Sequence, residues 1–190
     1  MIQDIARYVR VLEGGGVVAC PTETLVGLLA DALRQDAVER VVRIKGRAPD
    51  APIAVLLPDV AAWDRVARDV PPAARALASA HWPGPLTLVA WARPGLPAAL
   101  VHDGKVGARV PGPSPALELV RAFGGPLTAT SANRSGEPPA RDAAQAARVL
   151  GDRLDAVVPG VAPGGRASTV LDVTADPPRV LRAGAVAISQ

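Results

Sequence analysis

Apolar residues recur along the chain at two kinds of spacing, which predict helices and short strands in mixed order. Apolar side chains at helical spacing run through residues 2–12 and end at three glycines, Gly14 to Gly16. Short apolar runs that end at Pro, Gly or polar residues instead predict buried strands. We therefore expect helices over residues 2–12, 36–44, 59–67, 72–80, 115–123 and 142–150, and strands over residues 17–20, 52–57, 86–91, 106–110, 127–130, 169–173 and 179–181.

This mixture of elements predicts an α/β or α+β fold, in which a sheet is layered with helices. The spacings between predicted strands include hairpin lengths and lengths that suit crossover connections. No linker rich in Pro or Gly is long enough to force a domain boundary, and 190 residues suffice for one core. We expect a single domain over residues 1–190, without a further C-terminal domain.

Composition narrows the class of protein but does not identify a ligand. The 49% hydrophobic and 21% charged content is ordinary for a soluble globular protein. Aromatic residues make up only 3%, so the core must consist mainly of Val, Leu and Ala. The formal net charge is +3, and the Lys and Arg residues are scattered, which permits an anionic ligand without selecting one.

Cysteine usage and hydropathy indicate a cytoplasmic protein. Cys20 is the one cysteine, and its apolar setting predicts a buried side chain in a reducing compartment. No apolar run approaches the roughly 18 residues that span a bilayer, and residues 1–10 lack the hydrophobic centre of a signal peptide. We expect no association with a membrane.

Two cations flank a glycine in Lys45-Gly46-Arg47, at the predicted end of a helix. Arg offers a planar fork of donors and Lys a mobile point charge, a combination that suits a polyphosphate. The alternative is purely structural, because cations at a helix C-terminus also interact favourably with the helix dipole. The spacing alone leaves both interpretations open.

Two polar segments directly follow predicted strands. Ser131 and Asn133, in the first, could orient a ligand at the carboxyl edge of the sheet. Glu23, in Pro21-Thr22-Glu23-Thr24, could bind an ammonium group or hold Mg²⁺ through water. The alternative for both segments is an ordinary turn capped by its own side chains. Further polar residues at strand ends are Arg109, Ser168, Thr169 and Arg182.

The chain lacks the sequence motifs of several common catalytic and metal-binding sites. The chain has no Gly-x-x-x-x-Gly-Lys-Ser/Thr loop and no Gly-x-Ser-x-Gly motif. His81 and His102 lie far apart, and one cysteine cannot supply a structural zinc site. We expect no resident metal, and we expect Trp82 to pack in the core.

Seven short segments in a fixed order resemble the YrdC-like family of threonylcarbamoyl-AMP synthases, over about residues 15–187. Each motif is short, but their joint order and spacing are specific. The segments are Pro21-Thr22-Glu23-Thr24, Lys45-Gly46-Arg47, Trp82-Pro83-Gly84-Pro85-Leu86-Thr87, Arg109-Val110-Pro111, Ser131-Ala132-Asn133-Arg134-Ser135-Gly136, Ser168-Thr169-Val170 and Leu181-Arg182-Ala183-Gly184.

The resemblance implies a twisted mixed sheet with a concave basic face, on which ATP and threonine lie side by side. Lys45 and Arg47 would then hold the ATP phosphates and offset the charge that develops on them. Ser131 and Asn133 would line the nucleotide, and Arg182 would add a nucleotide contact.

The resemblance also implies a threonine site. Thr24, Arg109 and Ser168 would hold threonine, with Arg109 as the partner of its carboxylate. Thr22 would assist them, and Ser131 would border the threonine as well as the nucleotide.

The reaction of the family condenses threonine with bicarbonate or CO₂ to a carbamate. A carbamate oxygen then attacks the α-phosphate of ATP, with Mg²⁺ present, and expels pyrophosphate. The product would pass to a partner transferase complex that modifies an adenosine in transfer RNA.

Two other interpretations stay open. The segment Thr24 to Leu29 lacks an aromatic residue, at Val26, and a glycine, at Leu29, that the family often has. This difference allows a paralogue with another acceptor. The concave face could instead form an RNA-binding module, or bind RNA weakly beside catalysis, although one Tyr and one Phe offer little base stacking. A purely structural protein would tolerate Ala at Lys45, Arg47 and Ser131.

Overall fold

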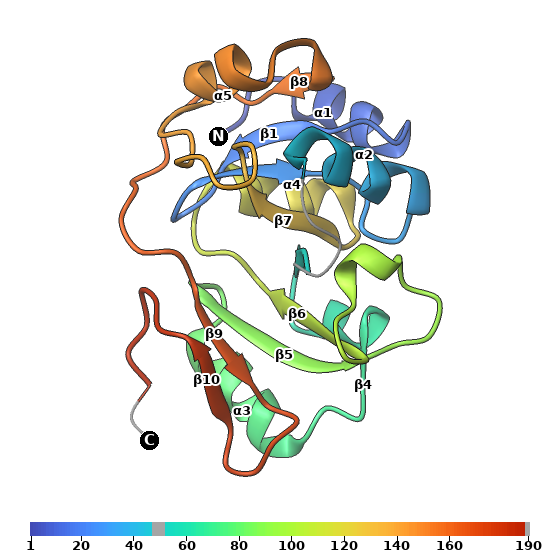
Figure 1. The fold of residues 1–190 in the computed structure, drawn as a ribbon, viewed down its shortest axis with the longest axis vertical. Helices are drawn as coiled ribbons and strands as arrows, with labels where there is room; N and C mark the ends of the chain where they lie inside the picture. Colours follow the sequence, from blue (N-terminus) through green and yellow to red (C-terminus); the bar gives the residue numbers. More distant parts are fainter. Residues whose placement is uncertain (47–51, 189–190) are drawn as a thin grey trace.

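The apolar runs pair into a mixed β-sheet in the computed structural model, which describes residues 1–46 and 52–188 (Figure 1). The ten strands follow the order β10-β9-β5-β6-β3-β7-β2-β1-β8, and β4 pairs with β5. The pairs β1–β8, β3–β6 and β5–β9 are parallel, and the others are antiparallel. The strands are β1 (Val18–Pro21), β2 (Val26–Leu29), β3 (Ala54–Leu56), β4 (Ala67–Arg68), β5 (Leu86–Ala92), β6 (Lys105–Arg109), β7 (Leu127–Ser131), β8 (Ala156–Val157), β9 (Thr169–Asp172) and β10 (Arg179–Arg182).

Helices cover this sheet at both of its ends (Figure 1). Helices α1, α4 and α5 contact β1, whereas α3 contacts β5. Ser114 caps α4 by accepting from the Leu117 amide, and Asp142 caps α5 by accepting from the Gln145 amide. The α-helices are α1 (Ile5–Glu13), α2 (Gln35–Lys45), α3 (Pro72–His81), α4 (Pro115–Phe123) and α5 (Ala143–Leu150), and the 3₁₀ helices are η1 (Ala61–Arg65), η2 (Ala98–Leu100) and η3 (Gly151–Arg153).

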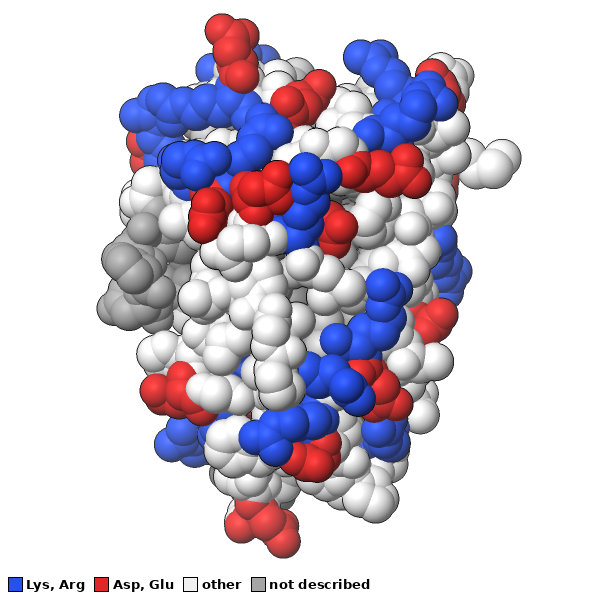
Figure 2. Space-filling view, turned by 90° about the vertical axis from the view of Figure 1, so that its right-hand side faces the viewer, with Lys and Arg blue, Asp and Glu red and all other residues white. Residues whose placement is uncertain are grey.

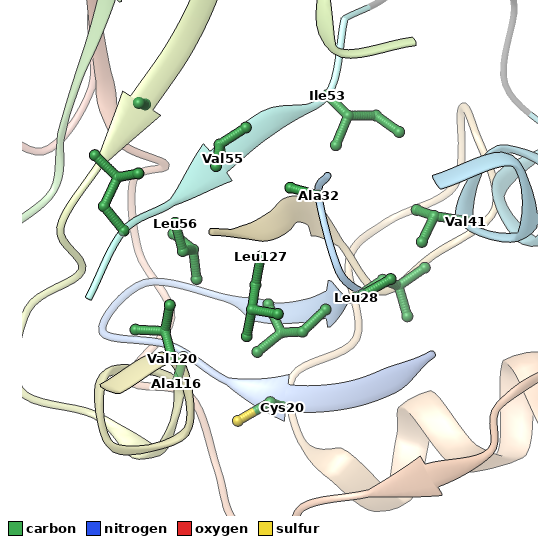
Figure 3. Packing of buried hydrophobic residues seen from close by; sticks show 14 of the residues in the cluster. Cys20, Leu28, Ala32, Val41, Ile53, Val55, Leu56, Ala116, Val120 and Leu127 are labelled. Atoms are coloured by element: carbon green, nitrogen blue, oxygen red, sulfur yellow. The ribbon is translucent and has the colours of Figure 1, made fainter. Parts of the chain in front are cut away.

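The core consists mainly of Val, Leu and Ala, as the composition predicts (Figure 3). Cys20 is fully buried within it, and this burial raises the pKa of its thiol far above the usual range. Trp82 packs edge-to-face on Trp63, with 4.9 Å between the ring centroids, and its indole N–H donates to the Leu86 carbonyl. The predicted packing roles of Cys20 and Trp82 are therefore confirmed.

The predicted α/β class is confirmed, but three strands escaped the sequence analysis. Strands β4 and β8 have two residues each, and β2 is a four-residue run interrupted by Gly27. The helix expected over residues 59–67 is wrong, because this segment forms η1 and then β4. The single domain over residues 1–190 stays a prediction. No helix of the described chain is long and apolar enough to cross a membrane.

Candidate active site

A cavity of about 650 Å³ lies over the sheet and is bordered by residues from β2, β3, β5, β6, β7, β9 and β10. Small residues on the strands beneath it, notably Gly27 on β2 and Gly107 on β6, leave room for the cavity. A Cβ atom on Gly107 would lie only 3.2 Å from the Thr87 methyl group. Six of the residues predicted from the sequence border this one cavity, namely Thr22, Thr24, Arg109, Ser131, Ser168 and Arg182.

Arg109 is the most deeply buried cation of this cavity. Its side chain is 9% exposed and forms an ion pair with Glu23, with 3.2 Å between Arg109 Nη2 and Glu23 Oε1. Burial lowers the pKa of Arg109, the Glu23 charge opposes that shift, and the Arg182 charge adds to it. Arg109 Nε has no hydrogen-bond partner within residues 1–46 and 52–188. A buried guanidinium with an unused donor is suited to bind a carboxylate.

Ser168 and Arg182 form a polar group beside Arg109, at the edge of β9 and β10. Arg182 Nη2 donates to the Ser168 carbonyl at 2.8 Å and to Ser168 Oγ at 3.1 Å. Ser168 Oγ also lies 3.0 Å from Thr87 Oγ1. Desolvation lowers the pKa of Arg182. These bonds fix the orientation of the guanidinium toward the cavity.

The chain segment after Arg182 is fastened by Gly184 and Thr169. A Cβ atom on Gly184 would overlap the backbone of residues 167–169, so only glycine allows this close approach. Thr169 Oγ1 donates to the Val186 carbonyl at 2.6 Å and accepts from the amides of Gly184 and Val186. Thr169 is thus a structural residue of its motif, whereas Ser168 faces the cavity.

Thr22 and Thr24 have different positions within their turn. Thr22 Oγ1 accepts from the amides of Thr24 and Leu25 and donates to the Leu25 carbonyl. This is the local hydroxyl cap that the structural alternative predicts. Both residues border the cavity, and Thr24 Oγ1 lies 3.0 Å from Thr22 Oγ1. Because the turn already uses the Thr22 hydroxyl, Thr24 is the better placed of the two to contact a ligand.

Lys45 joins two segments that the sequence analysis treated separately. Its side chain is buried, and the ammonium donates to the Ser131 carbonyl at 2.7 Å and to Asn133 Oδ1 at 3.0 Å. Ser131 Oγ also donates to Asn133 Oδ1, and Asn133 Nδ2 donates to the Glu137 carbonyl. Lys45 and Asn133 therefore lie behind Ser131, which is the member of this group that borders the cavity.

Arg47 lies outside the described residues, so its predicted contact with phosphate stays a prediction. Lys45 borders a second, smaller hollow of about 280 Å³ at the C-terminal end of α2. Arg43, Arg134 and Arg153 surround that hollow.

The sequence analysis missed a second ion pair of the cavity. Lys105 Nζ lies 2.9 Å from Asp172 Oδ2 and 5.0 Å from the centre of the Trp91 ring. The two partners come from β6 and β9, 67 residues apart, and no sequence motif marks them.

Basic side chains outnumber acidic ones around the cavity. The basic residues are Lys105, Arg109, Arg179 and Arg182, and the acidic ones are Asp103 and Asp172.

The outer face shown in Figure 2 has a more even mixture of charges. Lys and Arg are interspersed with Asp and Glu in two zones, with a band of uncharged side chains between them. Among the described side chains of this face, Figure 2 shows no continuous basic stripe.

The described residues contain no group of three or more His, Cys, Asp or Glu that could hold a metal ion. Asp172 pairs with Lys105, and Glu23 pairs with Arg109. Asp103 also borders the cavity but is 83% exposed. A divalent ion at this site would therefore depend mainly on oxygens of a bound ligand.

Comparisons with known proteins agree with this geometry. A family model named Sua5_yciO_yrdC and described as "Telomere recombination" matches residues 10–184. The chain belongs to the Sua5/YciO/YrdC family. The resemblance inferred from the seven motifs is thus confirmed.

Two curated members of the family are similar over nearly the whole chain. The threonylcarbamoyl-AMP synthase of Bacillus subtilis is 37% identical over 98% of this chain and 55% of its own length. The putative threonylcarbamoyl-AMP synthase of Mycobacterium tuberculosis is 39% identical over 96% of this chain and 84% of its own length. The chain thus spans about half of the first relative and most of the second.

A solved structure of the family supports the fold and contains a ligand. The crystal structure of P. abyssi Sua5 complexed with L-threonine matches with a TM-score of 0.90 and 35% identity. The match covers 95% of this chain and 54% of that chain.

Proposed function

We propose that this protein condenses L-threonine, bicarbonate or CO₂, and ATP to threonylcarbamoyl-AMP and pyrophosphate. It would thus be a nucleotidyltransferase. Two relatives named as synthases of this product, and a family structure with bound threonine, support the proposal. The observation that carries it is the cavity, in which a buried guanidinium with an unused donor lies among hydroxyl groups.

The threonine end of the proposed reaction lies at Arg109. Its guanidinium would bind the threonine carboxylate, because a planar fork matches a carboxylate in a water-poor site. Thr24, Ser168 and Ser131 border the same cavity with hydroxyl groups that can orient the rest of the amino acid. Thr22 would act by shaping the turn that presents Thr24.

The nucleotide end would lie between Ser131 and Arg182. Arg182 is oriented toward the cavity by Ser168, and Lys45 supports Ser131 and Asn133 from behind. We propose that Lys45 and Arg47 bind the phosphates, with Asn133 setting the geometry of the Ser131 segment. Lys45 would have to exchange some of its present bonds for phosphate oxygens.

The chemistry requires positioning, without a nucleophile from the protein. The threonine amine attacks the carbon of CO₂, or of bicarbonate with loss of water, and gives a carbamate. A carbamate oxygen then forms a bond to the α-phosphorus of ATP, while the bond to pyrophosphate breaks. Holding the reactants side by side removes much of the entropic barrier, and fixed cations stabilise the charge on the leaving group.

Mg²⁺ would enter with ATP and neutralise charge on its phosphates. Asp172 and Glu23 are already paired with cations and Asp103 is largely exposed, so phosphate oxygens would be the main ligands of the ion. We further propose a cytoplasmic location and transfer of the product to a complex that modifies transfer RNA.

Pyrophosphate release tests the proposal directly. The protein is incubated with Mg²⁺ and ATP, and threonine and bicarbonate are added singly and together. Release that requires both substrates and is lost in Lys45→Ala supports the synthase. The surface variant Arg75→Ala, whose ion pair with Asp64 is exposed, should retain activity.

Two outcomes would redirect the assignment. Pyrophosphate release without threonine would indicate a paralogue with another acceptor. Binding of RNA that weakens steeply with salt, without any consumption of ATP, would indicate the RNA-binding module.

A further inference from the structure

The Lys105 ammonium is held in place at the rim of the cavity. It donates to Asp172 Oδ2 at 2.9 Å and lies over the Trp91 ring at 5.0 Å. Two backbone hydrogen bonds between Lys105 and His102 fix the start of β6. The side chain of Lys105 is 24% exposed, so it has access to the cavity that it borders.

Only one oxygen of its carboxylate partner depends on Lys105, because Asp172 Oδ2 accepts from the ammonium. Asp172 Oδ1 already accepts from the Thr174 amide at 3.0 Å and from Thr174 Oγ1 at 2.7 Å. The Lys105 ammonium, by contrast, has three protons, and Asp172 is its one hydrogen-bond acceptor among the described residues. The pair therefore leaves donors of a positioned cation available on the cavity side.

The register of the sheet places Lys105 at the opposite end of the cavity from Arg109. Both residues lie on β6 four positions apart, so their side chains share one face, with Gly107 between them. Four residues of strand extend over about 13 Å. A threonine bound through its carboxylate at Arg109 is too short to reach Lys105, whereas a nucleoside triphosphate is long enough.

The same register brings Lys105 to the level of Ser131. Strand β3 pairs with β6 on one side and with β7 on the other. Continuing both registers to Pro52 aligns Lys105 and Ser131 on either side of β3, about 10 Å apart. A polyphosphate that contacts Ser131 would thus face the Lys105 ammonium.

We propose that Lys105 binds phosphate oxygens of ATP, or of the pyrophosphate released from it, at the end of the cavity opposite Arg109. Asp172 and Trp91 act as positioning residues that hold the ammonium for this contact. The inference rests on the proposed function for the identity of the phosphate, but the phosphate contact itself can be tested without turnover.

Affinity measurements on Lys105→Met test the contact. The dissociation constants of Mg²⁺–ATP and of pyrophosphate should rise about tenfold to a hundredfold, the range for a hydrogen bond to a charged group. Those of threonine and adenosine should stay unchanged, and Lys105→Arg should recover part of the loss. Arg75→Met serves as the control for loss of an exposed cation. Unchanged ATP and pyrophosphate affinity, or equal weakening of adenosine, would overturn the proposal.

A second measurement uses the unaltered protein, and so does not depend on the folding of a variant. The chain has two lysines, Lys45 and Lys105, and Lys45 is buried with 4% exposure. Acetylation of each, followed by mass spectrometry, should show that pyrophosphate slows the modification of Lys105 and that adenosine does not. Equal rates with and without saturating pyrophosphate would overturn the proposal. Protection of Lys105 in a protein that shows no threonine-dependent turnover would retain the phosphate contact and reject the synthase.

Discussion

Replacing Arg109 with Met should destabilise the protein as well as remove the proposed carboxylate contact. Glu23 would keep its charge in a site where its side chain is 12% exposed, without the guanidinium that now faces it. Removing one partner of a buried ion pair costs about 3–5 kcal/mol. The ion pair spans 3.2 Å and Glu23 Oε1 makes no hydrogen bond within the described residues, so the expected loss lies near the lower end, about 3 kcal/mol.

Thermal unfolding followed by circular dichroism gives the size of this effect. For a chain of 190 residues each kcal/mol lowers Tm by about 2–4 °C, so Arg109→Met should melt about 6–12 °C below the wild type. Adding Glu23→Gln should recover most of this loss, because an amide tolerates burial better than an unpaired carboxylate.

Threonine binding separates the two roles of Arg109. The double variant should regain stability but not threonine affinity, because the partner of the carboxylate is still missing. The reasoning would be refuted if Arg109→Met had the same Tm as the wild type, or if the double variant bound threonine with wild-type affinity.

Three further predictions concern the residues that shape the cavity. Gly184→Ala should weaken ATP binding about tenfold or more in equilibrium titration, because the new Cβ displaces the segment that follows Arg182; unchanged affinity would contradict this. Thr169→Val should cost about 1–3 kcal/mol in urea unfolding and speed hydrogen exchange at Gly184, since it loses the bonds that fasten the C-terminal segment. Burial alone would raise the pKa of Asp172, but hydrogen bonds from Thr174 and Lys105 lower it. Its contribution to stability is thus present above the unfolded pKa near 3.9 and lost as the pH falls through the folded value. In Asp172→Asn, Tm should therefore fall less steeply as the pH drops below about 4. A pH dependence of Tm identical to that of the wild type would rule this out.

The predictable parts of the fold were those with a long periodic pattern. Helices α4 and α5 carry Ser114 and Asp142 as N-caps, and their bounds match the sequence prediction to within a residue. Strand β2 had no such signal, because Gly27 interrupts a short apolar run and β1 supplies its pairing partner. The apolar residues of the η1 segment have helical spacing, but the segment forms a 3₁₀ helix and not an α-helix.

The site was predictable as a set of residues but not as a set of contacts. Spacing placed Lys45 at the end of a helix, yet its burial against Ser131 depends on a strand 86 residues away. The partner of Arg109 was equally hidden, since Glu23 also lies 86 residues away in the sequence and is brought near only by the fold of the sheet. Local pattern identifies such side chains, and tertiary pairing determines what each of them contacts.

Incorporation of ¹³C-bicarbonate tests the central proposal most directly. The protein is incubated with Mg²⁺, ATP, threonine and labelled bicarbonate. The nucleotide products are then separated quickly and identified by mass spectrometry. The account predicts an adduct of AMP and threonine that carries one labelled carbon and is absent when threonine is omitted. Consumption of ATP with no labelled adduct would contradict the account.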